Sequence, residues 1–477
     1  MKKPGLALSI ATLLALMALL ALCVVFFGDD ATSGPIQIAL LLSTLLTAGI
    51  AILFLKVPWS KVEEDISENI RQTAPTLLIL LSIGALTATW MLSGTVPTMI
   101  YYGLKMISPR FFIVITFVLC SLVSILAGSS WTTVGTIGVA MLTAGKLIGL
   151  PVGWMAGAII SGAYLGDKLS PLSDAVNLAA TVAGSDLYKH IRYSLHTVIP
   201  AFIICFTVYL IVGLTLPASA EIEMDAELNA ISNTFHISPW LLLIPCLTIF
   251  MVVKKIPAFL TLFVSALVGG LVAFWAQPQI VLQIAGEGSG VGSALSTVFK
   301  MMSTPIAVDT GNELLNNLTS TRGMAGMINT VWLVICIMSA GGALAGSGML
   351  ETLTNALIKM IRGAGSLVAT TVGTCIVSNM ILADQYMAIL LPGKMFATTY
   401  KKLGYAPELL SRTLGDSATV SSVLVPWNTC AVIQSTVLGV ATMAYFPYAL
   451  FCFVTPVIAI LLAAFNFKIH RLEPHEN

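Results

Sequence analysis

Apolar runs of about 20 residues recur along almost the whole chain, and each is long enough to cross a bilayer as a helix. They include 5–27, 35–55, 193–216 and 258–276. Of the 477 residues, 57% are hydrophobic and 9% are charged, whereas about a quarter of the residues in a soluble globular protein are charged. A membrane β-barrel would show short alternating segments instead. We therefore expect an all-α polytopic membrane protein with about ten to thirteen spans.

The distribution of Lys and Arg predicts that both termini lie in the cytoplasm, because cytoplasmic loops carry an excess of these residues. Lys2 and Lys3 precede the first apolar run, and Lys468 and Arg471 follow the last one. The stretch 217–236 carries acids and no Lys or Arg, which is typical of an external loop. We predict a multi-pass protein of the cell's inner (plasma) membrane, in contact with the lipid bilayer.

The sequence holds no signature of an enzyme or of a cofactor site. The eight cysteines form no CxxC pair, the five histidines form no HExxH motif, and there is no GxxxxGK[ST] loop for phosphate. A formal net charge of +1 gives no sign of nucleic-acid binding. We expect no catalytic residues, no cofactor and no nucleic-acid partner. A channel or a membrane enzyme is the least favoured class, since neither a selectivity-filter ring nor a nucleophile constellation is visible.

Two Gly-Asp segments suggest an internal repeat. Gly166-Asp167 and Gly415-Asp416 lie 249 positions apart (416 − 167). Ser129-Ser130 and Ser378-Asn379 precede the two aspartates by the same 38 positions (167 − 129 and 416 − 378). Each segment also carries serines, one proline and one asparagine, namely Pro171 with Asn177 and Pro426 with Asn428. Together these matches predict two related halves of the chain.

We expect the two halves to occupy 60–216 and 305–466. The first half would carry a hairpin near 166–184 and the second a hairpin near 415–440. A pair of transmembrane segments at 1–59 would precede them, and an acidic external loop with linker helices at 217–304 would separate them. The remaining residues, 467–477, would form a cytoplasmic tail.

Polar residues and prolines inside apolar runs predict a transport site. Irregular backbone at membrane depth is tolerated only where it is buried in protein or lines a wet cavity. Broken segments at corresponding places in two halves point to the binding site of a secondary transporter. An aspartate at the bilayer centre costs about 2.5–3.5 kcal/mol. Four aspartates in or beside apolar runs should therefore face a polar interior: Asp167, Asp174, Asp384 and Asp416.

Carboxylates, hydroxyls, amides and free carbonyls are hard oxygen ligands that suit Na⁺ or a divalent cation, and the absence of a ring of acids favours Na⁺. A buried carboxylate can hold H⁺ or Na⁺ but not both, so alternating access would produce antiport. We place Na⁺ at the Asp174/Asn177 and Asp416/Asn428 hairpins. The candidate cation- and proton-binding residues are Asp174, Asn177, Asp416, Asp384, Asp167, Asn428, Ser170, Ser173, Ser421 and Thr429.

Structural roles compete with these assignments. Asp174 and Asn177 share a helical face, but the amide can instead be satisfied at a helix cap. Asp167 and Lys168 would form either a structural ion pair or a gate at the cytoplasmic mouth. Asp416 has no base beside it in the sequence, which favours it as the proton carrier. Two further acids, Asp309 and Glu313, would line either a cation vestibule or a solvated helix face.

Four stretches of the sequence resemble the NhaC family of sodium/proton antiporters. They are "GDKLSPLSDAVNLAA" from residue 166, "DTGNELL" from 309, "ADQYMAILLPGKMF" from 383 and "LSRTLGDSATVSSVLVPWNTC" from 410. The resemblance covers most of the chain after residue 60. It implies the ion-transporter superfamily architecture: two inverted repeats with re-entrant hairpins and discontinuous transmembrane helices, a scaffold domain and a transport domain, and an elevator-like motion.

The sequence departs from the family pattern at four positions. Gly415 and Ala418 stand where the family has an acid and a glycine, and Ala175 and Val176 stand where it has two threonines. The family also resembles sodium-lactate/malate-proton exchangers. Beside Na⁺/H⁺ antiport, a Na⁺- or H⁺-coupled transporter of a small carboxylate or amino acid therefore stays open. The oligomeric state also stays open, with a homodimer among the options.

Overall fold

The computed structural model describes residues 4–215, 228–229, 231–285, 291–307, 316, 320–358 and 361–472. Within these ranges the chain is made of helices, short turns and two isolated β-bridges. The expected vestibule residues Asp309 and Glu313 fall outside the described residues, as do the acids at 221–227. The described chain is therefore the all-helical protein that the apolar runs predicted.

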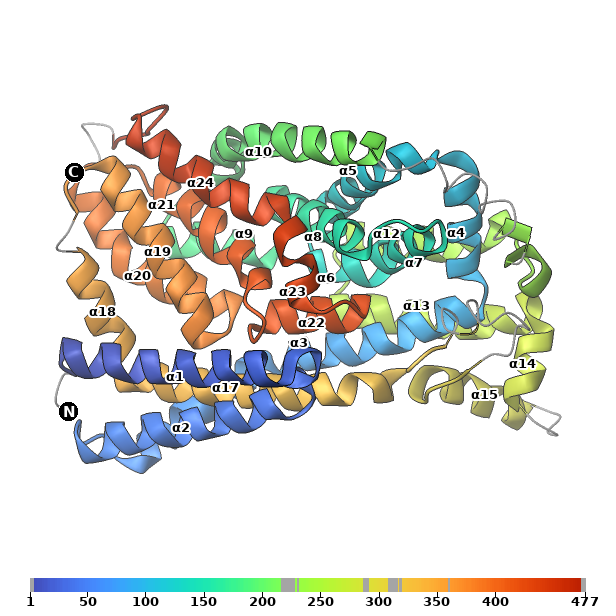
Figure 1. Cartoon of the computed structure of the whole chain (residues 1–477), viewed down its shortest axis with the longest axis horizontal. Helices are drawn as coiled ribbons and strands as arrows, with labels where there is room; N and C mark the ends of the chain where they lie inside the picture. Colours follow the sequence, from blue (N-terminus) through green and yellow to red (C-terminus); the bar gives the residue numbers. More distant parts are fainter. Residues whose placement is uncertain are drawn as a thin grey trace.

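Long helices form one layer that runs along the lower part of Figure 1. The helices α1 (Leu6–Phe27), α2 (Pro35–Leu53), α3 (Trp59–Leu92) and α17 (Ile328–Ser347) pack side by side there. The helices α13 (Ala258–Ala276) and α15 (Val291–Ser303) pack along α3. Glycines let α17 approach α3 closely, because a Cβ on Gly342 would lie 2.7 Å from the Ile66 Cα.

The helices of the upper part are more often broken (Figure 1). On one side lie α5 (Pro109–Ala127), α8 (Val152–Leu169) and α10 (Leu187–Thr215), which pack on one another. On the other side lie α19 (Ala364–Leu382), α20 (Gln385–Lys402), α21 (Pro407–Leu414) and α24 (Leu450–Ala464). Short helices complete the set, among them α4 (Thr95–Met106), α6 (Ser130–Thr133), α7 (Val139–Leu147), α9 (Asp174–Ala183), α12 (Leu243–Val253), α18 (Met349–Ile358) and α22 (Thr429–Leu438).

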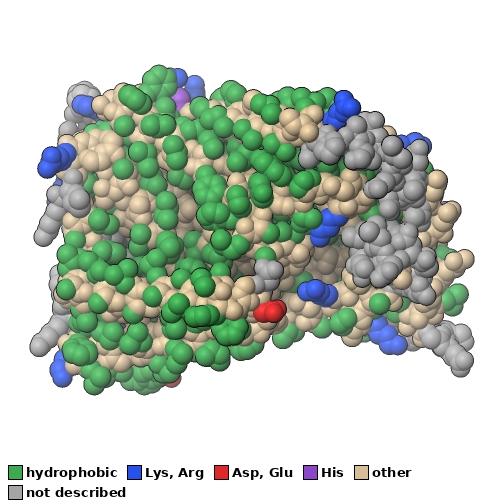
Figure 2. All heavy atoms as spheres, viewed as in Figure 1, with side chains coloured by type: hydrophobic (Ala, Val, Ile, Leu, Met, Phe, Trp, Pro, Cys, Tyr) green, Lys and Arg blue, Asp and Glu red, His purple; other side chains and the backbone are tan. Residues whose placement is uncertain are grey.

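Eight helices in the described part are long and apolar enough to cross a membrane. A ninth is added if Thr429–Leu438 and Thr442–Tyr448, which meet at an angle of 87°, count as one broken span. This number is below the predicted ten to thirteen, because several apolar segments are interrupted and form helices too short to qualify. Figure 2 shows hydrophobic side chains over most of one face with few charged ones among them. The chain is an integral, polytopic membrane protein.

Two pairs of helices of equal length recur in the same order in the two halves, but their offset is 255 positions and not 249. Helices α5 and α19 have 19 residues each and begin 255 apart (364 − 109). Helices α9 and α22 have 10 residues each and begin the same distance apart (429 − 174). Both end at a glycine in the left-handed conformation, Gly184 and Gly439. The inverted relation between the halves stays a prediction.

This offset corrects the register that the Gly-Asp pairs suggested. At 255 positions the counterpart of Asp167 is Ser422, not Asp416. Asp416 instead lies in a π-helical turn, η5 (Gly415–Thr419), which continues α21. The two aspartates therefore have different surroundings, and the resemblance between their neighbouring residues does not make them a symmetric pair.

Candidate functional site

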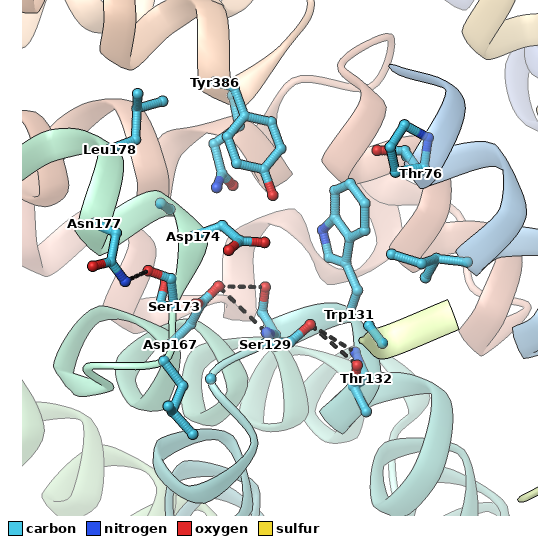
Figure 3. Close-up of a pocket in the computed structure, with 18 of the residues that line it drawn as sticks. Thr76, Ser129, Trp131, Thr132, Asp167, Ser173, Asp174, Asn177, Leu178 and Tyr386 are labelled. Carbon is cyan, nitrogen blue, oxygen red and sulfur yellow. Dashed lines mark hydrogen bonds between the residues drawn. The ribbon is translucent and has the colours of Figure 1, made fainter. Parts of the chain in front are cut away.

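A cavity of about 1130 Å³ lies where several helices break or end. It is bounded by the middle of α3, the turn 127–132 after α5, the break 171–174 between α8 and α9, the stretch 255–259 and the start of α20. Figure 3 shows the polar side chains that meet there. Three of the four predicted aspartates line this cavity: Asp167, Asp174 and Asp384.

Asp167 is held by the short helix α6. It lies in the last turn of α8, and its Oδ2 accepts hydrogen bonds from the Ser130 hydroxyl at 2.8 Å and the Ser130 N–H at 3.3 Å. The start of α6 is fixed in turn by Ser129, whose Oγ accepts from the Thr132 N–H (Figure 3). A helix N-terminus favours a nearby negative charge, so this contact stabilises the ionised carboxylate.

Two glycines bring Asp167 to this position. A Cβ added to Gly162 would collide with the Phe117 carbonyl oxygen, and one added to Gly166 would collide with the Ser121 carbonyl oxygen. Only glycine therefore allows α8 to lie this close to α5. The close approach sets the end of α8 beside the start of α6, where Asp167 finds Ser130.

Asp174 is the first residue of α9, and its side chain is exposed to the cavity. Figure 3 shows its carboxylate directed into the space between Tyr386 and Trp131. Among the described residues, none donates a hydrogen bond to this carboxylate. Asp174 is therefore the carboxylate of the cavity whose oxygens are most available to a ligand.

The other polar residues of the first break brace the backbone. Asn177 donates from Nδ2 to the carbonyls of Pro171 at 3.1 Å and Ser173 at 2.8 Å. Ser173 caps α9 by accepting from the Val176 N–H, and Ser170 accepts from the Leu172 N–H. The Asn177 amide therefore has the structural role that was weighed against cation binding. These hydrogen bonds fix the backbone of the break between α8 and α9.

Asp384 lies at another helix break that borders the cavity, between α19 and α20. Ala383 before it has a left-handed backbone (φ 54), and Asp384 caps α20 by accepting from the Met387 N–H at 2.9 Å. Its Oδ2 accepts from the Thr429 hydroxyl at 3.3 Å, which joins this turn to the start of α22. Asp384 and Thr429, both predicted as site residues, are therefore in contact.

The three cavity carboxylates come from two helix breaks, because Asp167 and Asp174 flank the break between α8 and α9 and Asp384 lies between α19 and α20. Within the described residues, no three acidic, histidine or cysteine side chains stand close enough to hold a metal ion together. One cation, Lys255, also lines the cavity, and its backbone is left-handed (φ 59). The cavity thus offers dispersed oxygen ligands and one positive charge.

Asp416 does not line the cavity. It forms ion pairs with Lys168 and with Arg412, whose Nε lies 3.5 Å from Oδ2, and it accepts a hydrogen bond from the Thr197 hydroxyl at 2.8 Å. The side chains of Asp416, Lys168 and Arg412 are completely buried. Asp416 has no base beside it in the sequence, but two bases contact it in the folded chain, and Lys168 pairs with Asp416 and not with Asp167.

Asn428 and Ser421 belong to a buried amide network at the second break. Asn428 caps α22 by accepting from the Cys430 N–H at 3.0 Å, and its Nδ2 donates to Asn379. The Asn379 amide donates to the Ser421 hydroxyl at 2.9 Å. The expected pair of Asp416 with Asn428 is therefore not formed, because each residue is committed to other partners.

A sequence model described as the Na⁺/H⁺ antiporter family matches residues 162–467. The chain belongs to this family. The matched range contains all three cavity aspartates and the buried cluster of Lys168, Arg412 and Asp416.

Named relatives cover nearly the whole chain. The Na(+)/H(+) antiporter NhaC of Alkalihalophilus pseudofirmus is 35% identical over 87% of this chain and 87% of its own length. The malate-2H(+)/Na(+)-lactate antiporter of Bacillus subtilis is 33% identical over 90% of this chain and 88% of its own. The arginine/ornithine antiporter ArcD of Halobacterium salinarum is 30% identical over 100% of this chain and 95% of its own.

In this antiporter-family chain, sequence reasoning missed two groups near Asp416. Arg412 is completely buried, and its guanidinium carbon lies 4.4 Å from the centre of the Tyr193 ring. His190 is buried, and its Nδ1 lies 2.9 Å from the Ser411 hydroxyl. The spacing of Arg412 and Asp416, four positions apart on a helix, was a signal for an ion pair. The sequence did not place His190 beside Ser411, because the two residues come from α10 and α21.

Proposed function

We propose that this protein is a secondary active transporter that exchanges Na⁺ for H⁺ across the cell's inner membrane by alternating access. The observation that carries the proposal is the cavity that Asp167, Asp174 and Asp384 line from two helix breaks. Membership of the Na⁺/H⁺ antiporter family and the similarity to NhaC support it. Na⁺ and H⁺ are the transported substrates, and no cofactor takes part.

Na⁺ and H⁺ compete for the same carboxylate oxygens. Asp174 binds first, because its carboxylate is exposed to the cavity and has no donor among the described residues. Asp167 and Asp384 already accept hydrogen bonds, so they attract the cation through their charge across the cavity and do not share a ligand shell with Asp174. A protonated carboxylate loses its charge and its cation affinity, and this exclusion couples the two fluxes.

Alternating access requires that part of the protein moves against the rest. We assign the layer of α1, α2, α3 and α17 to the scaffold domain and the broken segments 166–184 and 415–440 to the transport domain. The breaks at 170–173 and 425–428 supply the irregular backbone that re-entrant hairpins need. The distribution of Lys and Arg supports a cytoplasmic location of both termini.

The test is a flux assay on purified protein in proteoliposomes, with an imposed Na⁺ gradient and a pH-sensitive dye inside. With wild-type protein, the pH of the vesicle lumen should change only when Na⁺ is present. Asp174→Asn should abolish this flux without loss of folded protein, because the side chain holds no structural bond. Glu351→Gln on α18, an exposed acid away from the cavity, is the matched control and should transport normally. Wild-type flux in Asp174→Asn would refute the assignment.

A second candidate is a Na⁺- or H⁺-coupled exchanger of a small carboxylate or amino acid. The cavity volume of about 1130 Å³ exceeds what a single Na⁺ needs, and Lys255 offers a positive charge to a carboxylate. Two relatives are named for malate and lactate and for arginine and ornithine. Uptake of labelled lactate, malate and amino acids, with Na⁺ varied separately, distinguishes the two candidates. Lys255→Gln should reduce organic anion uptake and leave Na⁺/H⁺ exchange intact.

A further inference from the structure

Two buried polar side chains near the cavity make no hydrogen bond. Gln434 belongs to α22 and Tyr164 to α8, and both are completely buried. In the described part of the chain, neither the amide nitrogen nor the amide oxygen of Gln434 has a partner, and the Tyr164 hydroxyl has none either. A buried polar group without a partner lowers stability, so the presence of three such atoms requires an explanation.

The two side chains are neighbours and lie one helical turn beyond the cavity wall. Tyr164 lies beside the side chains of Gln434 and Cys430. On α8, Tyr164 precedes Asp167, which lines the cavity, by three positions (167 − 164). On α22, the Cys430 thiol donates to Gln385 Oε1 at 3.1 Å, and Gln385 also lines the cavity. A line of polar groups therefore leads from the cavity wall through Cys430 to Tyr164 and Gln434.

This line of polar groups points toward the outer side of the membrane. Helix α10 carries Lys189 in its first turn and ends before the acidic stretch 217–236, so we expect its start in the cytoplasm and its end outside. Nearer its end, the Tyr209 hydroxyl lies 3.1 Å from the carbonyl of Gly157, in the first half of α8, and 2.7 Å from the carbonyl of Tyr448, after α22. Both α8 and α22 therefore connect the cavity with the outer side, and the two unpartnered side chains lie between them.

Water would supply the missing hydrogen bonds if α22 and α8 separated. In the present packing the Gln434 and Tyr164 side chains are out of its reach. Helix α22 packs against η2 (Val134–Gly138), a π-helical turn that continues α6, and such turns are frequent at functional sites. The contact between α22 and its neighbours is therefore less favourable than an apolar contact of the same shape, and its separation is correspondingly easier.

We propose that Gln434 and Tyr164 line the route by which Na⁺ leaves the cavity toward the outer side, and that they are packed here in the closed form of that route. The inference rests on the proposed Na⁺/H⁺ exchange by alternating access. When the route opens, water hydrogen-bonds the amide and the hydroxyl. The closed form carries the cost of the unpartnered groups, and the open form does not. Both are positioning residues, because they act on the balance of the two forms and not on the bound ion.

Apolar substitutions test this balance in the purified full-length protein. Gln434→Met keeps the length of the side chain, and Tyr164→Phe removes only the hydroxyl. Each variant relieves the closed form of an unpartnered group and deprives the open form of a hydrated one. Both should melt at a higher temperature than wild type in detergent and bind ²²Na⁺ as wild type does. In proteoliposomes, both should exchange Na⁺ for H⁺ about tenfold more slowly.

Tyr209→Phe is the control for the melting temperature. The Tyr209 hydroxyl is equally buried but has partners, so its removal should lower the melting temperature. If one of the Gln434 and Tyr164 variants does not fold, the other decides. Variants that melt earlier than wild type, or that exchange at the wild-type rate, would overturn the inference and leave the proposed exchange intact. A wild-type protein without Na⁺-dependent proton flux would overturn the proposed function itself.

The native thiol of Cys430 gives a second measurement, because it lies in the same line of polar groups and is completely buried. A membrane-impermeant thiol reagent is added outside right-side-out vesicles during Na⁺ exchange, and mass spectrometry of the peptides locates the label. Cys430 should be labelled in wild type and markedly less in Gln434→Met. Cys120, buried between α5 and α8, is the control and should stay unlabelled. Absence of label on Cys430 in exchanging wild-type protein would overturn the inference.

Discussion

Substitution of Asp384 separates its structural role from its role in cation binding. The carboxylate caps α20 through the Met387 N–H at 2.9 Å and accepts from the Thr429 hydroxyl at 3.3 Å. Asparagine has the same shape and is as good an N-cap as aspartate, whereas alanine cannot accept either bond. The pair Asp384→Asn and Asp384→Ala therefore tests charge and hydrogen bonding independently.

The expected loss of stability follows from the two bonds. Removing an N-cap costs about 1 kcal/mol. Losing a hydrogen bond to a charged acceptor costs about 1.5–3 kcal/mol. We take the lower value, about 1.5 kcal/mol, because the Thr429 hydroxyl lies 3.3 Å from the carboxylate, which is a long contact. Asp384→Ala should therefore be destabilised by about 2–3 kcal/mol. Asp384→Asn keeps the cap and a neutral partner for Thr429, so its loss should stay below about 1 kcal/mol.

Both variants should lose Na⁺ affinity, because neither presents a carboxylate to the cavity. The measurements are thermal unfolding in detergent, which ranks the stabilities, and ²²Na⁺ binding at a pH where wild type is saturated. We expect Asp384→Asn to melt near wild type yet bind Na⁺ weakly. An Asp384→Asn variant that binds Na⁺ as wild type does would refute the reasoning, as would one that melts as early as Asp384→Ala.

Two further predictions concern packing. Gly166→Ala should lower stability by about 1–3 kcal/mol and impair Na⁺ binding, because its Cβ would press on the backbone of α5 and displace the end of α8. Gly373→Ala on α19, where a Cβ meets nothing within 4 Å, is the matched control, and thermal unfolding should show equal or higher stability. Trp427→Phe should cost about 1 kcal/mol in the same assay, because the indole N–H donates to the Met380 carbonyl at 2.7 Å. Equal melting of Gly166→Ala and Gly373→Ala, or an unchanged melting temperature for Trp427→Phe, would contradict these contacts.

The sequence by itself determined the class of the protein and the residues worth examining. Apolar runs long enough to span a bilayer leave the backbone no alternative to helices, so the all-α membrane fold followed from composition and length alone. The cost of an aspartate in an apolar run identified Asp167, Asp174 and Asp384, which share one cavity. These inferences hold because they depend on local burial and not on how the helices are arranged.

Only the tertiary structure decided which polar groups face one another. Asp167 and Lys168 are neighbours in the chain, but α8 turns one toward the cavity and the other toward Asp416. The register of 255 between the halves became visible through helix ends and caps, since the Gly-Asp pairs at 249 match in letters alone. Two of the partners of Asp416 lie far away in the sequence, 248 positions at Lys168 (416 − 168) and 219 at Thr197 (416 − 197). The role of a charged side chain thus depends on partners that are distant in the sequence, and the packing of the helices brings these partners together.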